Sequence, residues 1–322
     1  MGQPGPPALT SAAGGCPLPR VLVVGDVIND VLVQAPWPLA LGDDNLAVIR
    51  SRPGGSAANQ AAWLAELGMD VVFAGRAGAR DAEFHRRELA RFGVEPRLAA
   101  DESVPTGTIV VLVGPDGERT MITDRGANLR LGPADVPAAL LDDAALLHLT
   151  GYSFFEPGPR AVVRGLLAEA GRRGVPVTVD PGSAAFLAAP SIGPAAFLGW
   201  TRGAAVCFPN VDEAAVLAGA DPPPAADPAA MAAVLTGYYG AVVVKLGADG
   251  AVYAARGTTP GRVAAAPAAV RDTTGAGDAF CAGFLAAWLG GAPLAAACAV
   301  AAETAARAVS ILGGRPEAEG GP

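Results

Sequence analysis

The sequence contains very little lysine and histidine. Among its 322 residues there is one lysine, Lys245, and there are two histidines, His85 and His148. Because Leu246 follows the lysine, the chain has no Gly-Lys-Ser/Thr phosphate-binding loop, and two histidines far apart in sequence exclude a histidine-rich zinc site. The 31 acidic residues exceed the 23 basic ones, which gives a net charge of −8. This balance argues against non-specific nucleic-acid binding, which needs clustered positive charge.

Cysteine is also scarce, and no two cysteines have Cys-x-x-Cys spacing. The four are Cys16, Cys207, Cys281 and Cys298. Most lie in apolar runs, which is typical of buried free thiols in a reducing compartment, so we expect a cytoplasmic protein. The longest apolar stretch, 281–302, is interrupted by Gly290, Gly291 and Pro293. Two buried helices explain this stretch better than a membrane span.

From Arg20 onward, short β-branched segments alternate with longer segments rich in alanine and leucine. This alternation predicts an α/β protein with a largely parallel central sheet flanked by helices. The predicted strands cover residues 21–24, 71–74, 146–150, 175–180, 204–208 and 241–245. The predicted helices cover residues 56–67, 81–92, 159–173, 211–217, 228–239, 276–289 and 293–312. We expect one domain over residues 20–314, between disordered tails at 1–19 and 315–322 that are rich in glycine and proline.

Two segments, 31–52 and 97–124, depart from this alternation. They contain strand-like runs without a helix between them, and the second includes a Gly-Pro-Asp-Gly turn at 114–117. Such a pattern predicts β-hairpins. We therefore expect a small antiparallel sheet that packs as a lid over one end of the main sheet.

The segment 272–278, Asp-Thr-Thr-Gly-Ala-Gly-Asp, runs directly into an apolar helix. Its small residues allow a tight turn that presents consecutive backbone N–H groups at a helix N-terminus, where the helix dipole favours an anion. Asp278 falls in the first helical turn, where its carboxylate could accept a proton from a substrate hydroxyl. The alternative is an N-capping aspartate after a glycine-rich turn.

Two other segments carry polar groups suited to a polyol. Gly54 and Gly55 allow a ligand close to the backbone, and Asn59 offers both a donor and an acceptor in the first turn of the next helix. A tight loop before a capped helix is the alternative. Asp26 and Asp30 follow the first strand, where ligands gather in parallel sheets, and either could hold neighbouring hydroxyls. A lone aspartate after a strand is also typical of turns.

Together these segments, in this order, resemble the ribokinase-like (PfkB) family of ATP-dependent sugar and nucleoside kinases. The matching positions are Gly54, Gly55, Ala57, Asn59, Ala61, Gly68 and Gly78 in the first signature, and Asp272, Thr273, Gly275 to Asp278, Ala282, Gly283 and Phe284 in the second. The resemblance covers about residues 21–314. It implies a ribokinase-like three-layer fold with a small β lid that covers the sugar and often mediates homodimers.

The resemblance also implies roles for individual residues in an ATP-dependent phosphorylation of a sugar hydroxyl. Asp278 would be the general base, and the turn of Gly275, Ala276 and Gly277 would be the anion hole. The residues that would hold the substrate hydroxyls are Asp30, Gly54, Gly55 and Asn59.

For the nucleotide, the resemblance implies that ATP contacts Asn210, Lys245, Gly247, Gly250 and Gly277. In the same way, Asn210 and Glu213 would position Mg²⁺, largely through water, although their spacing alone fits a capping box at a helix start. Asp272 and Thr274 match positions that bind a monovalent cation, such as K⁺, in some members.

The substrate is left open by this resemblance. In the first signature, Ser56 and Ala57 occupy the two positions at which ribokinases have lysine and glycine, so the resemblance does not imply ribose itself as the substrate. A nucleoside kinase on the same scaffold and a non-catalytic sugar or nucleotide sensor are the alternatives. Arg119 and Arg125 would reach a phosphate or an acidic sugar from the lid, or else are solvated surface charges. We expect a small-molecule substrate and no nucleic-acid or membrane partner.

Overall fold

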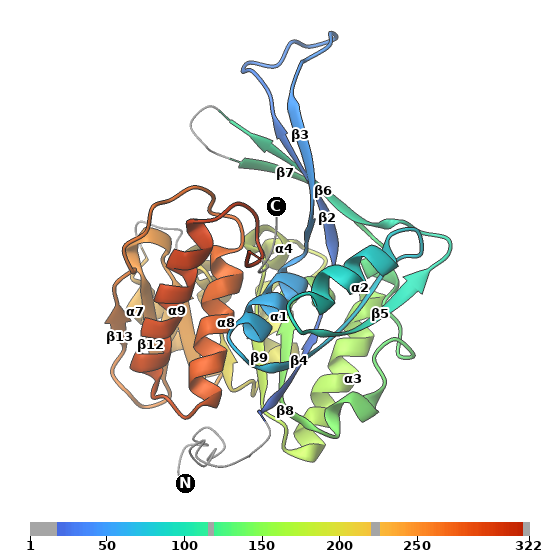
Figure 1. The fold of residues 1–322 in the computed structure, drawn as a ribbon. Helices are drawn as coiled ribbons and strands as arrows, with labels where there is room; N and C mark the ends of the chain where they lie inside the picture. Colours follow the sequence, from blue (N-terminus) through green and yellow to red (C-terminus); the bar gives the residue numbers. More distant parts are fainter. Residues whose placement is uncertain (1–17, 115–118, 220–225, 318–322) are drawn as a thin grey trace.

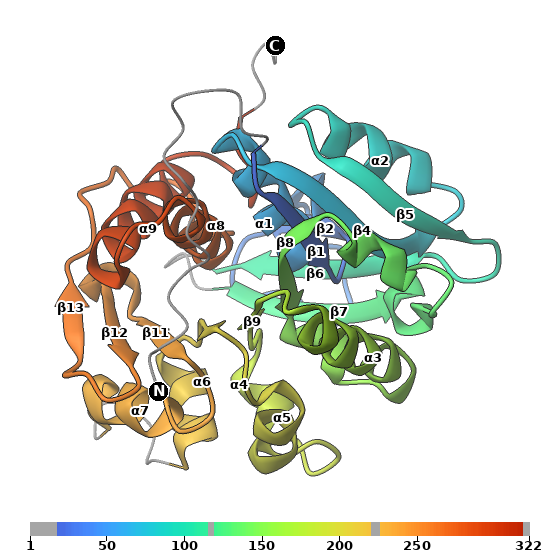
Figure 2. The same ribbon diagram turned by 90° about the horizontal axis from the view of Figure 1, so that it is seen from below.

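The structure is a computed structural model, and it describes residues 18–114, 119–219 and 226–317. Within these ranges the body of the protein is a nine-stranded sheet with helices on both faces (Figure 1, Figure 2). In spatial order its strands are β13 (Gly261–Val263), β12 (Ala251–Ala255), β11 (Ala241–Lys245), β10 (Val206–Cys207), β9 (Val177–Asp180), β8 (Ala144–Thr150), β1 (Arg20–Val24), β4 (Asp70–Gly78) and β5 (Glu95–Asp101).

From β11 to β5 the strands of this sheet pair in parallel, whereas β12 and β13 run antiparallel at one edge. The central strand β1 shows why the sequence favours this arrangement. All four residues from Val21 to Val24 are fully buried, which is expected of a parallel strand that is covered on both faces. The predicted α/β fold with a largely parallel sheet is confirmed.

Each face of the sheet packs against its own set of helices and forms its own core. The helices on one face are α1 (Ser56–Glu66), α2 (Ala82–Ala90), α8 (Ala276–Leu289) and α9 (Leu294–Val309). The helices on the other face are α3 (Pro157–Arg173), α4 (Ala184–Ala188), α5 (Pro194–Thr201), α6 (Val211–Ala218) and α7 (Pro228–Leu235). Figure 2 shows the two sets on opposite sides of the sheet.

Helices α8 and α9 pack closely because their contact surface is built from small residues. A Cβ atom on Gly283 would lie 2.4 Å from Thr304 Oγ1, so a larger residue at this position would force the helices apart. This packing fixes the N-terminus of α8 beside α1, which it contacts along the same face of the sheet.

A second, four-stranded sheet projects from the body as the predicted lid (Figure 1). Its order is β3 (Val48–Gly54), β2 (Ile28–Gln34), β6 (Thr106–Val113) and β7 (Arg119–Gly126). The outer pairs, β2–β3 and β6–β7, are antiparallel as predicted. The central pair, β2–β6, is parallel, which the prediction of an antiparallel sheet did not include.

The predicted second lid segment, 97–124, is wrong for residues 97–101. These residues form most of β5, which pairs in parallel with β4 at the edge of the body sheet. Because β5 directly follows α2, it completes a strand–helix–strand unit with β4, and such a unit places its two strands side by side in parallel.

The chain ends also differ in part from the expectation. Residues 1–17 and 318–322, most of the two predicted tails, lie outside the described residues. The prediction of a disordered tail from residue 315 is wrong for Arg315, which is buried against α1. Among the residues that the structure describes, no helix is long and apolar enough to cross a membrane.

Candidate active site

Asp278 lies in the first turn of α8, at the carboxyl edge of the body sheet. Gly275 precedes this helix with a φ of 74°, and a Cβ atom there would lie 2.5 Å from the Cα of Gly314. The turn therefore requires glycine for its backbone angle and for its space. The first backbone N–H groups of a helix have no partner within the helix, so the turn from Gly275 to Gly277 can face an anion.

The carboxylate of Asp278 is held by three side chains of α1. Ser56 Oγ donates to Oδ1 at 2.7 Å, Gln60 Nε2 donates to the same oxygen at 3.1 Å, and Asn59 Nδ2 donates to Oδ2 at 3.0 Å. Burial raises the pKa of Asp278 to about 7, although the hydrogen bonds from Ser56 and Asn59 act in the opposite direction. A carboxylate with such a pKa can accept a proton near neutral pH.

The predicted substrate residues come together around Asp278. Asp30, on β2, faces Gly54 so closely that a Cβ atom on the glycine would lie 2.0 Å from Asp30 Oδ2. Gly55 has a φ of 97°, and a Cβ atom there would lie 2.6 Å from the carbonyl oxygen of Asp26. Burial, with the nearby carboxylates of Asp26 and Asp278, raises the pKa of Asp30 to about 7. The two glycines thus let the start of α1 approach β2.

Asp26, the other aspartate considered for hydroxyl binding, instead stabilises the start of α1. Its carboxylate accepts the backbone N–H groups of Ser56 and Ala57, each at 3.2 Å, and the hydroxyl of Thr150 at 3.3 Å. These are the N–H groups that a helix leaves unpaired at its N-terminus, so Asp26 acts as a cap from a distant strand end.

Arg315 is a site residue that the sequence interpretation missed. Its side chain is buried, its Nε donates to Asn59 Oδ1 at 3.3 Å, and its Nη2 donates to the carbonyl oxygen of Gly54 at 3.1 Å. Burial lowers its pKa to about 10, so it keeps its charge at neutral pH. Arg315 therefore links two of the predicted substrate residues and adds a positive charge beside two carboxyl groups, Asp30 and Asp278.

Replacing Arg315 by glutamine is expected to lower kcat/KM by at least roughly 10- to 100-fold, because the loss of even one hydrogen bond from a charged group costs about 1.5–3 kcal/mol. Arg315→Lys should recover part of this loss, since it keeps the charge but loses the planar fork of donors. Steady-state kinetics beside a thermal melt separate the effect on the site from an effect on folding. A glutamine variant within threefold of the wild type would contradict this role for Arg315.

A buried polar cluster lies behind Asp278 and involves two further residues that the sequence interpretation missed, Gln60 and Asp180. Lys245 Nζ lies 3.0 Å from Asp180 Oδ1, and Gln60 Nε2 donates to Asp180 Oδ2 at 3.0 Å. Burial acts to lower the pKa of Lys245, but the carboxylate of Asp180 acts in the opposite direction. The net effect raises the pKa of Lys245, so the lysine stays charged. Asp180 is the last residue of a buried strand, at the carboxyl edge of the sheet. This position could have identified it from the sequence as a candidate site residue.

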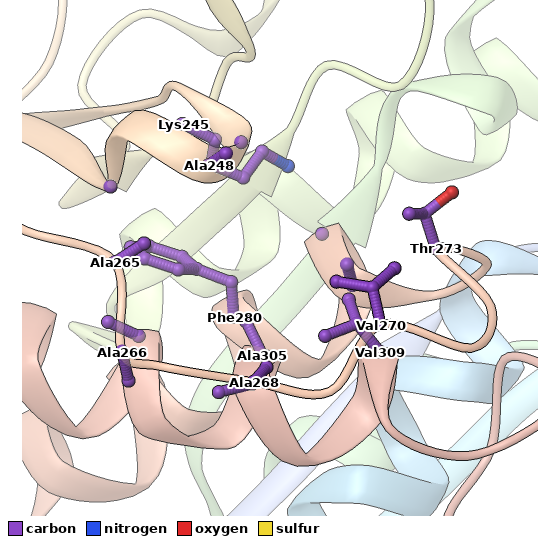
Figure 3. A pocket seen from close by; sticks show the side chains of 16 residues that line it. Lys245, Ala248, Ala265, Ala266, Ala268, Val270, Thr273, Phe280, Ala305 and Val309 are labelled. Carbon is purple, nitrogen blue, oxygen red and sulfur yellow. The ribbon is translucent and has the colours of Figure 1, made fainter.

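A cavity of about 500 Å³ lies next to the N-terminus of α8. Lys245, Gly247, Gly250 and Gly277, four of the predicted ATP residues, line it, whereas Asn210 does not. Figure 3 shows Lys245 and Ala248 on one side of the cavity, with Phe280, Ala305 and Val309 on the other. The walls are mostly apolar, and Lys245 is the one charged side chain among the described residues that line it. Such a cavity is large enough for a nucleotide.

Asn210 and Glu213 form the capping box that their spacing predicts. Asn210 Oδ1 accepts the backbone N–H of Glu213 at 2.8 Å, and Glu213 Oε2 accepts that of Asn210 at 2.9 Å. Burial raises the pKa of Glu213 to about 7, although the charge of Lys245 acts in the opposite direction. In the described part of the chain, no three histidine, cysteine, aspartate or glutamate side chains cluster as metal ligands.

Asp272 connects the turn before α8 to the end of the chain. Its carboxylate accepts the backbone N–H of Thr274 at 2.8 Å and that of Gly313 at 2.9 Å. It thereby places the segment that carries Arg315 beside the turn from Gly275 to Gly277. The monovalent-cation role that the resemblance implies for Asp272 and Thr274 stays a prediction.

The chain is similar to known kinases over nearly its whole length. The model of the pfkB family carbohydrate kinases matches residues 18–319. The chain is 33% identical to the ATP-dependent ribose-1-phosphate kinase of Halopiger xanaduensis, over 84% of this chain and 85% of that protein.

Solved structures give the same result. A crystal structure of adenosine kinase from Sinorhizobium meliloti has a TM-score of 0.81 at 25% identity and covers 94% of this chain and 96% of that one. The Arabidopsis thaliana ribokinase complexed with ribose and ATP has a TM-score of 0.76 at 27% identity, with coverages of 92% and 94%. The chain therefore belongs to the pfkB family of carbohydrate kinases.

Proposed function

We propose that the protein transfers the γ-phosphoryl group of ATP to a hydroxyl of a small sugar, with Asp278 as the general base. The observation that carries this proposal is the position of Asp278 between two sites. Its carboxylate contacts the substrate residue Asn59, and its neighbour Gly277 lines the nucleotide-sized cavity. A hydroxyl held beside Asp278 therefore lies next to the point where the phosphates would enter.

In the proposed reaction, Asp278 takes the proton of the sugar hydroxyl, and the hydroxyl oxygen forms a bond to the γ-phosphorus. The bond between that phosphorus and the β,γ-bridging oxygen breaks, and ADP leaves. The N–H groups at the start of α8 stabilise the negative charge on the transferred group. Lys245, whose charge is kept by Asp180, supplies further positive potential at the phosphate end of the cavity.

The donor set also fits Mg²⁺ that arrives with ATP, when it acts through water. Asn210 donates to both oxygens of Glu213, at 2.9 and 3.0 Å, which leaves the carboxylate poorly placed for direct coordination. Bound Mg²⁺ would offset phosphate charge, and Asn210 and Glu213 would orient its water ligands.

The pH dependence of the reaction should follow Asp278. Because only its ionised form accepts a proton, kcat/KM should be low below pH 6, rise through about pH 7 and level above it. Asp30 titrates in the same range, so the profile is also measured on Asp30→Asn. That variant should keep the acidic limb with a raised KM. If Asp30→Asn lost the acidic limb, the limb would report the ionisation of Asp30, which would contradict its assignment to Asp278.

A panel of acceptors tests the function itself, with ADP release as the readout. It contains ribose, fructose, ribose 1-phosphate, a sugar acid and adenosine, because the relatives are named for both sugars and a nucleoside. Turnover with a sugar supports the proposal, and turnover with adenosine alone identifies the nucleoside-kinase alternative. ATP binding without turnover on any acceptor would favour a sensor. Repeating the assay with Na⁺ in place of K⁺ tests the cation prediction.

The predicted homodimer through the lid is also retained as a proposal. Exposed apolar side chains on the lid strands support it, at Val48, Ile49, Met121 and Ile122.

A further inference from the structure

Gln60 lies at the centre of a buried polar network behind the proposed general base. Its side chain is fully buried, and its amide faces β9 from helix α1. The Nε2 atom lies 3.1 Å from Asp278 Oδ1, 3.0 Å from Asp180 Oδ2 and 3.1 Å from Ser56 Oγ. One amide group therefore connects the general base to the ion pair of Asp180 with Lys245.

The acceptors around Gln60 determine which way its amide points. Ionised carboxylates only accept hydrogen bonds, so the NH₂ group faces Asp180 and Asp278. If the amide were turned over, its carbonyl oxygen would lie against both carboxylates. The orientation with the NH₂ group on this side leaves the carbonyl oxygen, Oε1, in contact with Nε2 of His148 on β8.

His148 supplies the donor that this orientation needs. Its ring is fully buried, Nε2 contacts Gln60 Oε1, and Nδ1 lies 2.7 Å from the hydroxyl oxygen of Thr178. Burial lowers the pKa of His148 to about 4, so near pH 7 the ring is neutral and carries one proton. Because Gln60 Oε1 can only accept, that proton belongs on Nε2, and Nδ1 accepts the hydrogen bond of the Thr178 hydroxyl.

The body sheet holds His148 in this position. His148 on β8 pairs with Thr178 on β9, and Asp180 follows two residues later on the same face of the sheet. The ring of His148 also packs edge-to-face against Phe208, with the ring centroids 6.3 Å apart. Buried strands, and not a loop, therefore set the orientation of the Gln60 amide.

We propose that Gln60 is a positioning residue for Asp278, and that His148 fixes the Gln60 amide with its N–H groups towards the carboxylate. This inference rests on the proposed function, in which Asp278 is the base. A donor that stays in place favours the ionised carboxylate, which is the form that accepts the proton of the sugar hydroxyl. Burial raises the pKa of Asp278, and the hydrogen bond from Gln60 acts in the opposite direction. The alternative is that Gln60 only joins α1 to the sheet.

Other titratable and charged groups also act on Asp278 from the elements around it. They are Asp30 on β2, Asp180 on β9, Cys281 on α8 and Arg315 near the chain end. Asp180 is paired with Lys245, and burial raises the pKa of Cys281, which keeps this thiol neutral. Because Asp30 titrates near pH 7, each variant is also measured in the Asp30→Asn background.

Gln60→Met tests the role of the amide, because methionine is close to glutamine in length but has no N–H group. The acidic limb of kcat/KM, measured with the best acceptor, should move up by about one pH unit, as expected for one lost hydrogen bond to a charged group. At about pH 6 kcat/KM should fall about tenfold, and at about pH 9 it should return to within about threefold of the wild type. A glutamine that only supports the fold would give the same loss at every pH.

His148→Phe tests the orientation of the amide. Phenylalanine can keep the edge-to-face contact with Phe208 but removes the donor to Gln60 Oε1. The limb should move in the same direction, and the double variant with Gln60→Met should show no further shift, because no amide is left to orient. Asn59→Ala is the matched control. It removes a donor from the other oxygen of Asp278, so its shift should add to that of His148→Phe.

A spectrum of the wild type labelled with ¹⁵N-histidine gives a readout that does not depend on the stability of any variant. The chain has two histidines, His85 and His148, so replacing either one assigns both rings. We expect a neutral His148 with its proton on Nε2 at pH 7. A proton on Nδ1 would leave Gln60 Oε1 without a donor and would overturn the role of His148.

The remaining outcomes separate this inference from the function on which it rests. An unmoved limb in Gln60→Met, or an equal loss at every pH, would overturn the positioning role while leaving Asp278 as the base. Shifts of Gln60→Met and His148→Phe that simply add would overturn the role of His148. Normal turnover in Asp278→Asn, or absence of turnover on every acceptor, would instead overturn the proposed function.

Discussion

Replacing Asp278 by asparagine is expected to lower kcat by about 10²- to 10⁴-fold, which is the usual contribution of a positioned general base. The amide cannot accept the hydroxyl proton, but the turn before it and the nucleotide cavity are unchanged. The affinity for ATP should therefore stay within a few-fold of the wild type. A coupled assay of ADP release and calorimetric titration of ATP measure the two quantities separately.

Glu83→Gln is a matched control for this substitution. Glu83 is also an acidic residue in the first turn of a helix, α2, but it is exposed and pairs with Arg86. It should leave kcat unchanged. If Asp278→Asn retained turnover within tenfold of the wild type, Asp278 would not be the base, and proton transfer would have to be assigned to another group.

Replacing Lys245 by methionine is expected to destabilise the fold by about 3–5 kcal/mol, as is usual when one partner of a buried ion pair is removed. Lys245 and Asp180 have side chains that are 13% and 6% exposed, and no other cation lies within 4.0 Å of Asp180 among the described residues. The variant therefore leaves Asp180 buried without its counter-charge. Urea unfolding followed by circular dichroism gives the free energy of unfolding.

The double variant Lys245→Met, Asp180→Asn tests the cause of this loss. It removes the buried charge that the single variant leaves behind, so it should recover most of the stability. It should not recover ATP turnover, because the positive charge in the nucleotide cavity is still missing. A single variant that loses less than 1 kcal/mol would show that the pair is not coupled as the geometry indicates.

Much of the fold could be predicted because local sequence determines it. The runs Val21 to Val24 and Ala241 to Val244 are apolar throughout, as buried parallel strands require, and helix α3 ends at a glycine, Gly174. The elements that were missed carry weak local patterns. Helix α4 has only five residues, and β5 reads Glu-Pro-Arg-Leu-Ala-Ala-Asp, with few β-formers. Its pairing with β4 decides its structure.

In the site, too, the features set by local sequence could be predicted, whereas the contacts between distant residues could not. Gly55 and Gly275 are needed for local backbone angles, so the two glycine-rich turns that carry them can be recognised in the sequence. Arg315 reaches Asn59 across 256 positions of the chain, and no local pattern indicates that contact. Asp180 and Gln60 likewise meet only after β9 and α1 pack together.

The charges of the site explain how an acidic protein can bind phosphates. Burial raises the pKa values of Asp30, Asp278 and Glu213 to about 7, which reduces the negative charge near the reacting groups at neutral pH. Lys245 and Arg315 keep their positive charges beside them. The N-terminus of α8 adds its dipole at the same place.

A crystal structure of the protein with its sugar and a non-hydrolysable ATP analogue would show whether Asp278 contacts the reacting hydroxyl. We expect the accepting hydroxyl within about 2.6–3.2 Å of the Asp278 carboxylate, with the γ-phosphate at the N–H groups of the turn from Gly275 to Gly277. A hydroxyl that instead contacts only Asp30, or a γ-phosphate away from that turn, would contradict it.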